Sequence, residues 1–459
     1  MTSSGSRGQF GSKFGFIMAA AGSAVGLGNI WRFPYLTGEN GGGAFVLVYL
    51  GCVLVIGLPL LFNEVALGRM THKNPIGAFK DTGSNKFWLI GPILALCVSF
   101  FVLSYYSVIA GWTIGYIYTS LMGFSMSFDE FRASPEYVIP LLIFFLGINL
   151  LIVTKEISKG IEKASKILMP ILFVLIILVI LRSVTLDGAM AGLEYYLVPD
   201  LSKINGTTFL KALSQCFFSM SIGWGIMITY GSYLSKEESI VQSSLWIGLL
   251  DTGVALLGGL MVFPAVFAFG KDPASGPTLV FQILPEIFNS IPVGGHIVGA
   301  FFFLLLMIAA LTSTISMIEV PGSWLIDEKK WSRKKAAWVV VVAALIFGIP
   351  SALSQGANEI LSTMQLNIFG LTITSFMDIM DFIWGTLMIM VVALFVCLYI
   401  GWVLKPKKVI EEINSGSPYF TTKKIAGFTP AQIWSFFIRY VCPIVIVIVI
   451  LNQFNVFGS

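Results

Sequence analysis

GSAVGLGNIWRFP, residues 22–34, interrupts an apolar segment that is otherwise long enough to cross a membrane. A second interruption, FFSMSIGWG at residues 217–225, lies in a later apolar segment. Each contains a Gly-x-Gly, at residues 26–28 and 223–225. Because one glycine costs about 1 kcal/mol in a helix interior, the two pairs predict helices that unwind in mid-segment. Close helix packing is the alternative, since residues 22–26 also form a GxxxG pattern.

The composition around these segments is that of a membrane protein. The chain of 459 residues is 56% hydrophobic and 11% charged, whereas a soluble globular protein carries roughly 25% charged residues. This excludes a soluble enzyme, a disordered chain and a nucleic-acid binder. It predicts an all-α membrane protein, because the apolar runs are too long for barrel strands. The five cysteines occur without a CxxC and the two histidines lie far apart, so neither a disulfide framework nor a zinc or haem site is expected.

Eleven apolar segments are long enough to cross the bilayer as helices of about 20 residues. Their expected ranges are 13–36, 42–69, 88–123, 137–154, 167–183, 208–233, 241–270, 296–325, 337–353, 376–403 and 432–456. Residues 272–294 are too mixed in character to span the bilayer, and we expect them to form a re-entrant or surface helical loop.

The basic residues set the expected orientation. They concentrate after the second segment and in the gaps between segments 4 and 5, 8 and 9, and 10 and 11. These gaps fall on one side, which holds 22 of the 28 lysines and arginines. By the positive-inside rule this side is cytoplasmic. The N-terminus, which lacks the pattern of a signal peptide, is therefore expected in the cytoplasm, and the odd span count places the C-terminus outside.

The two interrupted segments are the first and the sixth of the eleven. Two consecutive sets of five spans have opposite orientations because five is odd, which predicts an inverted repeat. The expected divisions are a cytoplasmic tail (1–12), a first five-helix repeat (13–183), an inverted second repeat (208–403), a cytoplasmic loop (404–431) and an eleventh helix with the C-terminus (432–459). Interruptions at matching positions of two halves predict a binding site at the membrane midplane.

Charged residues within the expected spans point to a polar pathway, because a charge at that depth costs roughly several kcal/mol. They are Glu64, Asp251, Glu319, Asp378, Asp381 and Arg32. For any one of them, an interhelical contact or snorkelling to the membrane interface is the alternative, but the set favours a transporter or channel over a passive anchor. An unwound helix adds free carbonyls that can ligate a cation and free N–H groups that can hold a carboxylate.

Several long motifs resemble those of one membrane family. The matching stretches are residues 22–36, 39–46, GLPLLFNEVALGR at 57–69, 104–112, 215–225, 310–316 and DIMDFIWGT at 378–386. Together they resemble the neurotransmitter:sodium symporter family, whose bacterial members have the leucine-transporter fold. The resemblance covers essentially the whole chain. It implies Na⁺-coupled uptake by alternating access in a bacterial inner membrane, with two Na⁺ ions, no organic cofactor and no enzymatic activity.

The resemblance also implies the ligands of two sodium sites. The first site matches the carbonyl of Ala24 and the side chains of Asn29, Ser219 and Asp251. The second matches the carbonyls of Gly22, Val25 and Ala309 and the hydroxyls of Thr312 and Ser313. Both sets offer only oxygen, as an alkali cation requires. The family often has a neutral amide where Asp251 stands, and its chloride-dependent members bind an anion nearby. We therefore hypothesise that the Asp251 charge makes transport independent of chloride.

The matched substrate positions imply an amino acid. The carboxylate is expected at the N–H groups of Leu27 and Gly28 and the hydroxyl of Tyr106. Carriers of biogenic amines in the family have an aspartate at the position of Gly26, so glycine leaves the negative charge to the substrate. The complete expected set is Ala24, Gly26, Leu27, Gly28, Val102, Tyr106, Phe218, Ser219, Ser221, Ile222, Gly223, Trp224, Met227, Ser313 and Met317. No charged residue lines the wall, and methionine adapts to several shapes, so a hydrophobic or aromatic L-amino acid is predicted.

Further positions match gates and supports. Arg32 and Asp381 match an outer gate pair, with Tyr106 and Phe218 as the edge of its lid. On the cytoplasmic side, Arg7 matches an inner gate partner of Asp327, with Phe10 where a tryptophan is common. Glu64 is expected to accept hydrogen bonds from the unwound part of the sixth segment. The stretch from Gly160 to Pro170 is predicted to unwind, since proline removes a helical hydrogen bond; an ordinary helix start is the alternative.

Other functional classes are weighed by what the sequence offers. A channel would share the membrane charges but would need no occluded pocket with gates on both sides. A membrane enzyme is disfavoured because the sequence offers no nucleophile–base pair, metal cluster or phosphate loop. A biogenic-amine or other small-solute carrier is the nearest alternative, and a non-transporting amino-acid sensor stays open. A monomer is expected to suffice.

Overall fold

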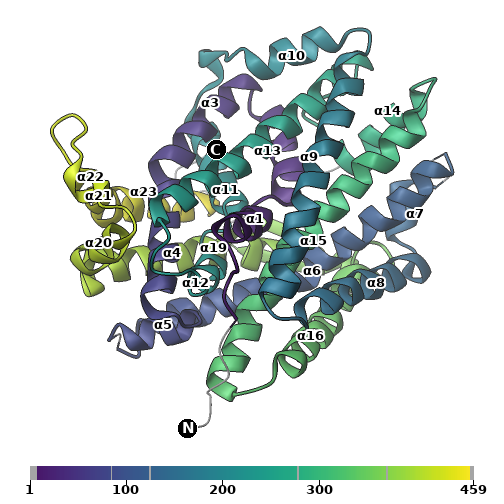
Figure 1. Cartoon of the computed structure of the whole chain (residues 1–459). Helices are drawn as coiled ribbons and strands as arrows, with labels where there is room; N and C mark the ends of the chain where they lie inside the picture. The colour runs from purple at the N-terminus through teal and green to yellow at the C-terminus, as the bar shows by residue number, and fades with distance from the viewer. Residues whose placement is uncertain (1–7, 84, 124–125, 277–278, 369–370, 455–459) are drawn as a thin grey trace.

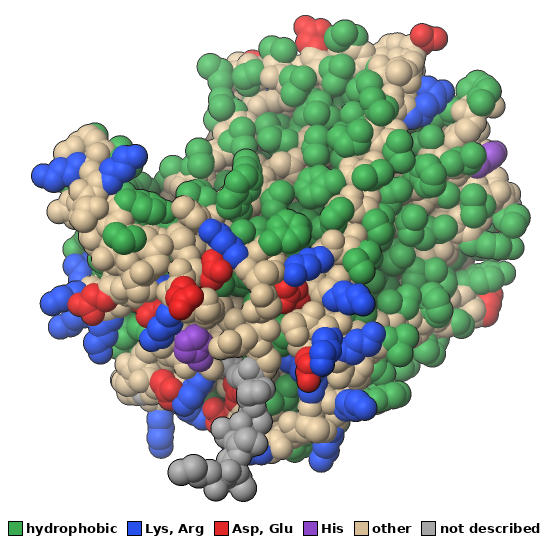
Figure 2. Space-filling view, viewed as in Figure 1, with side chains coloured by type: hydrophobic (Ala, Val, Ile, Leu, Met, Phe, Trp, Pro, Cys, Tyr) green, Lys and Arg blue, Asp and Glu red, His purple; other side chains and the backbone are tan. Residues whose placement is uncertain are grey.

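The computed structural model describes residues 8–83, 85–123, 126–276, 279–368 and 371–454. Figure 1 shows a bundle of long helices, with the C-terminal helices α20 to α22 gathered in a lobe on one side. Hydrophobic side chains cover a broad band of the face shown in Figure 2, and most charged side chains gather below it. Large apolar side chains are exposed on the membrane-length helices, among them Leu54 and Leu151 (66% and 69% exposed), which indicates lipid as the solvent.

The elements of the first half of the chain, in order, are α1 (Lys13–Ala24), η1 (Gly28–Arg32), α2 (Phe33–Glu39), α3 (Gly43–Cys52), η2 (Val53–Gly57), α4 (Leu58–Thr71), α5 (Pro75–Asp81), α6 (Ile90–Leu121), α7 (Phe128–Arg132), α8 (Pro135–Val153), η3 (Ser158–Glu162), α9 (Lys163–Val184), α10 (Ala189–Leu197) and η4 (Leu201–Lys203). Here η4 is a 3₁₀ turn, and η1, η2 and η3 are π-helical turns. Several of the helices are continuous through these turns.

The elements of the second half are α11 (Gly206–Ser219), α12 (Ile226–Gly231), α13 (Ile240–Ala268), η5 (Leu279–Ile283), α14 (Leu284–Ser290), α15 (Gly295–Lys329), α16 (Arg333–Leu353), α17 (Glu359–Thr363), β1 (Gln365–Ile368), β2 (Leu371–Thr374), α18 (Phe376–Met380), η6 (Asp381–Leu387), α19 (Met388–Leu398), η7 (Tyr399–Leu404), α20 (Pro406–Ser415), α21 (Tyr419–Thr422), α22 (Pro430–Phe436), η8 (Phe437–Val441) and α23 (Cys442–Gln453).

Nine helices within the described ranges are long and apolar enough to cross a membrane. We call α1 together with η1–α2 the first broken segment. Taken together, its two parts are also long and apolar enough to cross a membrane, and they are bent by 49° relative to each other. The second broken segment, α11 and α12, has 14 and 6 residues on either side of its break. Each of these two helices is too short to cross the membrane alone, so the second broken segment is not among the nine helices. The predicted interruption at residues 22–34 is confirmed.

Other expected boundaries and element types needed correction. The fifth span begins at Ser158 instead of residue 167, because Lys159, Lys163 and Lys166 lower the hydropathy of turns that are nevertheless helical. Residues 272–294 needed no correction, because they contain η5 and α14 and so form the expected helical loop. The antiparallel pair β1–β2 was not predicted, since a short, half-exposed hairpin leaves no mark on a search for long apolar runs.

The first helix lies at the centre of the bundle, where Figure 1 shows α1 nearly end-on. Ser12 caps it by accepting the Gly15 N–H at 3.0 Å, and every residue from Gly15 to Ala24 is buried. It packs against α9, α13 and α15, and α15 in turn packs along α6. The break after Ala24 is therefore enclosed by helices on all of these sides.

Candidate functional site

The break in the first segment replaces helical hydrogen bonds with bonds from side chains. Val25 takes an extended conformation and its N–H still donates to the Ala21 carbonyl at 2.6 Å. The next two N–H groups leave the helix: Gly26 donates to Asn29 Oδ1 at 3.0 Å and Leu27 to the Tyr106 hydroxyl at 2.9 Å. The carbonyls at the end of α1 therefore do not receive these two helical hydrogen bonds and can bind other partners.

The second broken segment unwinds between Ser219 and Ile226. Ser221, Gly223 and Gly225 all have positive φ angles, of 53°, 84° and 72°, which a helix cannot accommodate. The carboxylate of Glu64, buried on α4, accepts the freed N–H of Gly223 at 2.8 Å. This is the contact expected of Glu64 from the sequence.

A first cluster of oxygen-bearing side chains joins the two broken segments to α13. Ser219 Oγ donates to the two carboxylate oxygens of Asp251 at 2.8 and 3.0 Å. Asn29 Nδ2 lies 2.7 Å from Asp251 Oδ1 and 3.0 Å from Ser219 Oγ. Asn29 and Asp251 are fully buried. The structure therefore brings together three of the four residues expected at the first sodium site, and the fourth, Ala24, lines the adjacent pocket.

Electrostatics make this cluster suitable for a cation. Within the described ranges, every hydrogen-bond partner of the Asp251 carboxylate is neutral. An ionised carboxylate buried without a positive partner is strongly destabilising, and hard oxygen ligands suit an alkali ion. The amide of Asn29 donates to this carboxylate, while its oxygen accepts the Gly26 N–H of the broken segment.

A second cluster lies between the end of α1 and α15. The Ser313 hydroxyl is 3.0 Å from the Ser23 carbonyl, 3.5 Å from that of Val25 and 3.2 Å from that of Ala309. Thr312 Oγ1 lies 3.0 Å from the Ala309 carbonyl. A Cβ added to Gly22 would sit 3.3 Å from the Thr312 Cβ. All five residues expected at the second sodium site are therefore neighbours.

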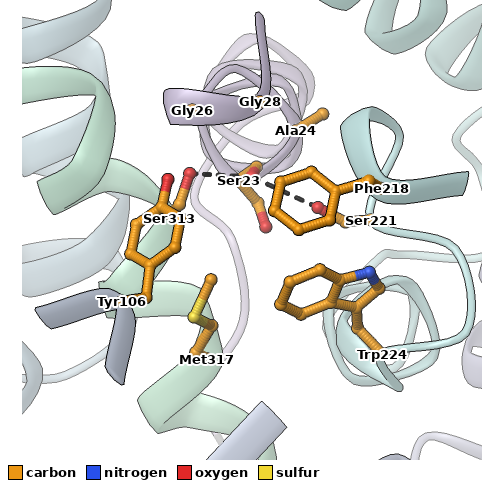
Figure 3. Close-up of a pocket in the computed structure, with 10 residues that line it drawn as sticks. All are labelled: Ser23, Ala24, Gly26, Gly28, Tyr106, Phe218, Ser221, Trp224, Ser313 and Met317. Atoms are coloured by element: carbon orange, nitrogen blue, oxygen red, sulfur yellow. Dashed lines mark hydrogen bonds between the residues drawn. The ribbon is translucent and has the colours of Figure 1, made fainter. Parts of the chain in front are cut away.

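A small pocket lies between the two broken segments, α6 and α15. Figure 3 shows the rings of Phe218 and Trp224 on one side, and Tyr106, Ser313 and Met317 facing them. Ten residues line the pocket: Ser23, Ala24, Gly26, Gly28, Tyr106, Phe218, Ser221, Trp224, Ser313 and Met317. Its volume of about 10 Å³ is close to the room one water needs.

Nine of the lining residues belong to the expected substrate-binding set. The remaining expected residues are buried nearby but do not line the pocket: Leu27, Val102, Ser219, Ile222, Gly223 and Met227. Gly26 is enclosed, since an added Cβ would lie 2.6 Å from Ser313 Oγ and 2.8 Å from the Tyr106 hydroxyl. At Gly28 it would lie 2.9 Å from the Phe218 ring. Only glycine leaves the backbone accessible at these two positions.

A larger cavity of about 330 Å³ lies beyond this pocket. Tyr106 and Phe218 line both spaces and so separate them, as expected for the edge of a lid. Arg32 and Asp381 both line the larger cavity, but in the described part of the chain they form no ion pair. Arg32 donates to Gln215 Oε1 at 3.1 Å and lies 5.0 Å from the centre of the Phe218 ring. Asp381 Oδ1 instead accepts the Tyr105 hydroxyl at 2.7 Å.

The opposite end of the first segment is closed by contacts of the N-terminal tail. Phe10 packs edge-on against Phe16, Tyr230 and Tyr233, with ring centres 5.5 to 6.1 Å apart. Asp327 accepts hydrogen bonds from the N–H and the side-chain amide of Asn74, at 3.1 and 2.9 Å. Its expected partner, Arg7, lies outside the described residues.

Glu162 is an important contact that the sequence did not reveal. Its carboxylate accepts the Gly11 N–H at 2.6 Å and the Ser12 hydroxyl at 3.0 Å, and pairs with Lys166 at 2.6 Å. It therefore clasps the start of α1 to η3, the turn that contains Gly160. Pro170 lies inside α9, which is helical throughout in this structure. We refer to these contacts of Glu162 as the tail clasp.

Two other residues also escaped sequence reasoning. The Ser23 carbonyl accepts the hydroxyls of both Ser221 and Ser313, at 3.2 and 3.0 Å; its place beside Gly22 in the interruption was the available signal. Arg333 donates two hydrogen bonds to the buried carboxylate of Glu319, at 2.8 and 2.9 Å. Glu319, predicted to be part of a polar pathway, is thus compensated by an arginine from the next helix.

Known proteins match this chain over nearly its whole length. A model of the sodium:neurotransmitter symporter family matches residues 7–134 and 125–459. The uncharacterized sodium-dependent transporter YhdH of Bacillus subtilis is 39% identical, with 98% of each chain covered. An uncharacterized sodium-dependent transporter of Haemophilus influenzae is 36% identical, covering 98% of this chain and 99% of the relative. The crystal structure of MhsT in complex with L-phenylalanine matches with a TM-score of 0.86 and 39% identity, over 97% of this chain and 100% of the other.

Proposed function

Because the chain belongs to the sodium:neurotransmitter symporter family, a family of sodium-dependent transporters and not of enzymes, we propose that it is a Na⁺-coupled symporter of hydrophobic or aromatic L-amino acids. The observation that carries this proposal is the glycine backbone at the wall of a pocket lined by Phe218, Trp224 and Met317. Backbone N–H groups at this break can hold a carboxylate. The pocket has no charged side chain that could bind the amine of a substrate without its own carboxylate.

Two Na⁺ ions would occupy the two oxygen clusters. At the first, an ion supplies the positive charge that the Asp251 carboxylate lacks among its described partners. At the second, carbonyls of Val25 and Ala309 and the hydroxyls of Thr312 and Ser313 would hold an ion between α1 and α15. Because Asp251 brings a fixed negative charge, we propose that transport needs no chloride.

Alternating access would follow from the positions of the gates. The central pocket is too small for an amino acid as it stands, so Phe218 or Trp224 must move aside for a substrate. Pairing of Arg32 with Asp381 would then close the outer cavity above the bound substrate. Opening of the tail clasp, with unwinding between Gly160 and Pro170, would release ions and substrate at the other face.

The broken segments also determine the proposed number of membrane spans. Counting the second broken segment as one span gives eleven spans, arranged as an inverted five-plus-five repeat with an extra C-terminal helix. We place the protein in a bacterial inner membrane, with the N-terminus in the cytoplasm and the C-terminus outside, and propose that a monomer suffices. Arg7 and Asp327 would then form the inner gate.

Equilibrium binding to the purified protein tests the substrate class. Labelled L-leucine should bind in sodium but not in potassium, and unlabelled L-phenylalanine and L-tryptophan should displace it. Phenylethylamine, which keeps the phenyl ring but lacks the carboxylate, should fail to displace it. Better competition by glutamate or lysine would refute an apolar pocket. Displacement by phenylethylamine would favour the biogenic-amine alternative, and binding without any uptake would favour a sensor.

Replacing Glu162 with glutamine is expected to weaken the tail clasp. The variant loses the ion pair with Lys166 and the charge-assisted bonds from Gly11 and Ser12. The state open to the cytoplasm should become more populated, so the sodium concentration for half-maximal substrate binding should rise roughly three- to tenfold. Sodium titrations of labelled leucine binding measure this directly.

The matched control for this change is Glu156→Gln. Glu156 is 67% exposed and, among the described residues, forms an ion pair only with Lys159, three residues along the chain, so the sodium titration of Glu156→Gln should stay within twofold of the unmodified protein. If the sodium titration of Glu162→Gln coincides with those of Glu156→Gln and the unmodified protein, the tail clasp has no part in gating.

A further inference from the structure

A lobe formed by residues 405–429 connects η7 to α22. Figure 1 shows it projecting from the side of the bundle, away from the other helices, and Figure 2 shows basic side chains at its tip. It contains α20, α21 and a tight turn before α22. Nothing in the proposed transport cycle uses this lobe, although its sequence is well ordered into secondary structure.

The base of the lobe is firmly attached to the bundle. Arg69, fully buried at the end of α4, pairs with Glu412 at 2.6 Å and donates to the Ser415 hydroxyl at 2.9 Å. On the other side, the buried Phe420 packs against the rings of Phe62 and Trp434, with centres 6.5 and 6.2 Å away. The tip is therefore held in a fixed position relative to the membrane-crossing helices.

The tip presents two apolar side chains on one face. Ile425 and Phe428 exchange backbone hydrogen bonds of 2.8 and 3.1 Å as an antiparallel bridge. Ala426 and Gly427 between them have positive φ angles of 50° and 88°, as in a two-residue hairpin turn. Side chains of directly opposed residues lie on the same face. Ile425 and Phe428, which are 54% and 60% exposed, thus form one apolar knob.

Positive charge surrounds this knob. Lys423 and Lys424 directly precede it and are exposed. Three further lysines stand at the start of the lobe: Lys405, Lys407 and Lys408. The lobe contains two acids, Glu411 and Glu412, and the second is already paired with Arg69. The knob and its surroundings are therefore apolar and basic, which is the combination that binds an anionic lipid surface.

Aromatic residues beside the lobe mark the level of the membrane surface. Trp402 and Tyr440, 54% and 44% exposed, pack edge-on with ring centres 5.6 Å apart. Phe436 adds a third exposed ring, and the Arg439 guanidinium lies 5.9 Å from the Trp402 ring. Exposed aromatic rings with a neighbouring arginine are typical of the boundary between lipid and water. They lie on η7, α22 and η8, the elements that flank the lobe on both sides.

We propose that this lobe is an anionic-phospholipid binding site. The Ile425–Phe428 knob enters the headgroup layer, and Lys423 and Lys424 contact the phosphates of anionic lipids. Each lysine near such a surface is expected to enrich anionic lipid about fivefold. The charge complementarity singles out lipid over a second copy of the chain, whose matching lobe would bring lysines against lysines. The proposal concerns the membrane contact alone and stands independently of the substrate.

Depth measurements with a nitroxide label test this in the full-length protein. The label is placed at Phe428→Cys in a Cys97→Ala background, since the other four cysteines are buried. The protein is studied in nanodiscs of phosphatidylcholine alone and of phosphatidylcholine with phosphatidylglycerol. With phosphatidylglycerol, the label should collide more with oxygen and severalfold less with a water-soluble nickel chelate than a label at the exposed Lys236→Cys.

Charge variants separate the lysines from a general effect of charge. Lys423→Gln with Lys424→Gln should return the Phe428 label to water-like nickel accessibility. The matched pair Lys155→Gln with Lys334→Gln removes two exposed lysines elsewhere and should change nothing. Water-like accessibility of the Phe428 label in both lipid mixtures would overturn the proposal. So would spin–spin broadening between labels, which would identify a second copy as the occupant.

Discussion

Replacing Gly26 with alanine is expected to lower the affinity for amino-acid substrate roughly 30- to 150-fold. The added Cβ would lie 2.6 Å from Ser313 Oγ and 2.8 Å from the Tyr106 hydroxyl. Both hydroxyls hold the broken segment in place, since Tyr106 accepts the Leu27 N–H and Ser313 reaches the Val25 carbonyl. Overpacking of this kind costs about 2–3 kcal/mol, and here it displaces the groups that would receive the carboxylate.

Labelled phenylalanine binding at saturating sodium measures this loss. Gly147→Ala is the matched control, because a Cβ at Gly147, also within a membrane-crossing helix, meets no atom within 4 Å. That variant should bind normally, and both should elute as single species in detergent. Unchanged affinity in a well-folded Gly26→Ala protein would show that the substrate carboxylate does not bind beside Gly26. The proposal of an amino-acid substrate would then lose its main support.

Replacing Asp251 with asparagine is expected to have the largest effect on sodium. The change preserves the size of the side chain but removes the one charge of the first cluster. A cation about 4 Å from a carboxylate at an effective dielectric constant of 20 gains about 4 kcal/mol. The sodium requirement for substrate binding should therefore rise of the order of 10²- to 10³-fold, as measured by sodium titration of labelled phenylalanine binding.

Two comparisons give this prediction its controls. Asp187→Asn changes an exposed aspartate in a loop and should leave the titration unchanged. The unmodified protein should bind equally in sodium chloride and sodium gluconate, because Asp251 supplies the negative charge itself. A requirement for chloride in the unmodified protein would contradict this role, as would an Asp251→Asn variant with normal sodium affinity.

The sequence predicted the breaks because glycine leaves a local mark. Gly26 and Gly28 disfavour helix wherever they stand, and the bend after Ala24 follows from them. The meeting of Asn29, Ser219 and Asp251, by contrast, depends on three separate segments, with Asn29 190 residues from Ser219 and 222 residues from Asp251 in the chain. Their grouping could be expected only through family resemblance. Composition and spacing alone would have left each as an isolated polar residue in an apolar helix.

The contacts that were missed share physical causes. Ser23 contributes a backbone carbonyl, which any residue type possesses, so only its position beside Gly22, and not its side chain, could have signalled the contact. Glu162 stands among lysines that indicated only a charged, cytoplasmic turn, while its partners are backbone and hydroxyl groups of the tail. The separation of Arg32 from Asp381 depends on the conformation of the protein. A sequence pattern can indicate that two residues are able to pair, but it does not indicate in which conformation they pair.

Uptake into proteoliposomes tests the central claim most directly. Labelled L-phenylalanine is supplied outside vesicles with an inward sodium gradient, with gluconate as the anion. The account predicts accumulation above the external concentration, loss of that accumulation when a sodium ionophore dissipates the gradient, and stronger uptake when the interior is made negative. Equal uptake in potassium, or equilibration without accumulation, would contradict coupling to sodium.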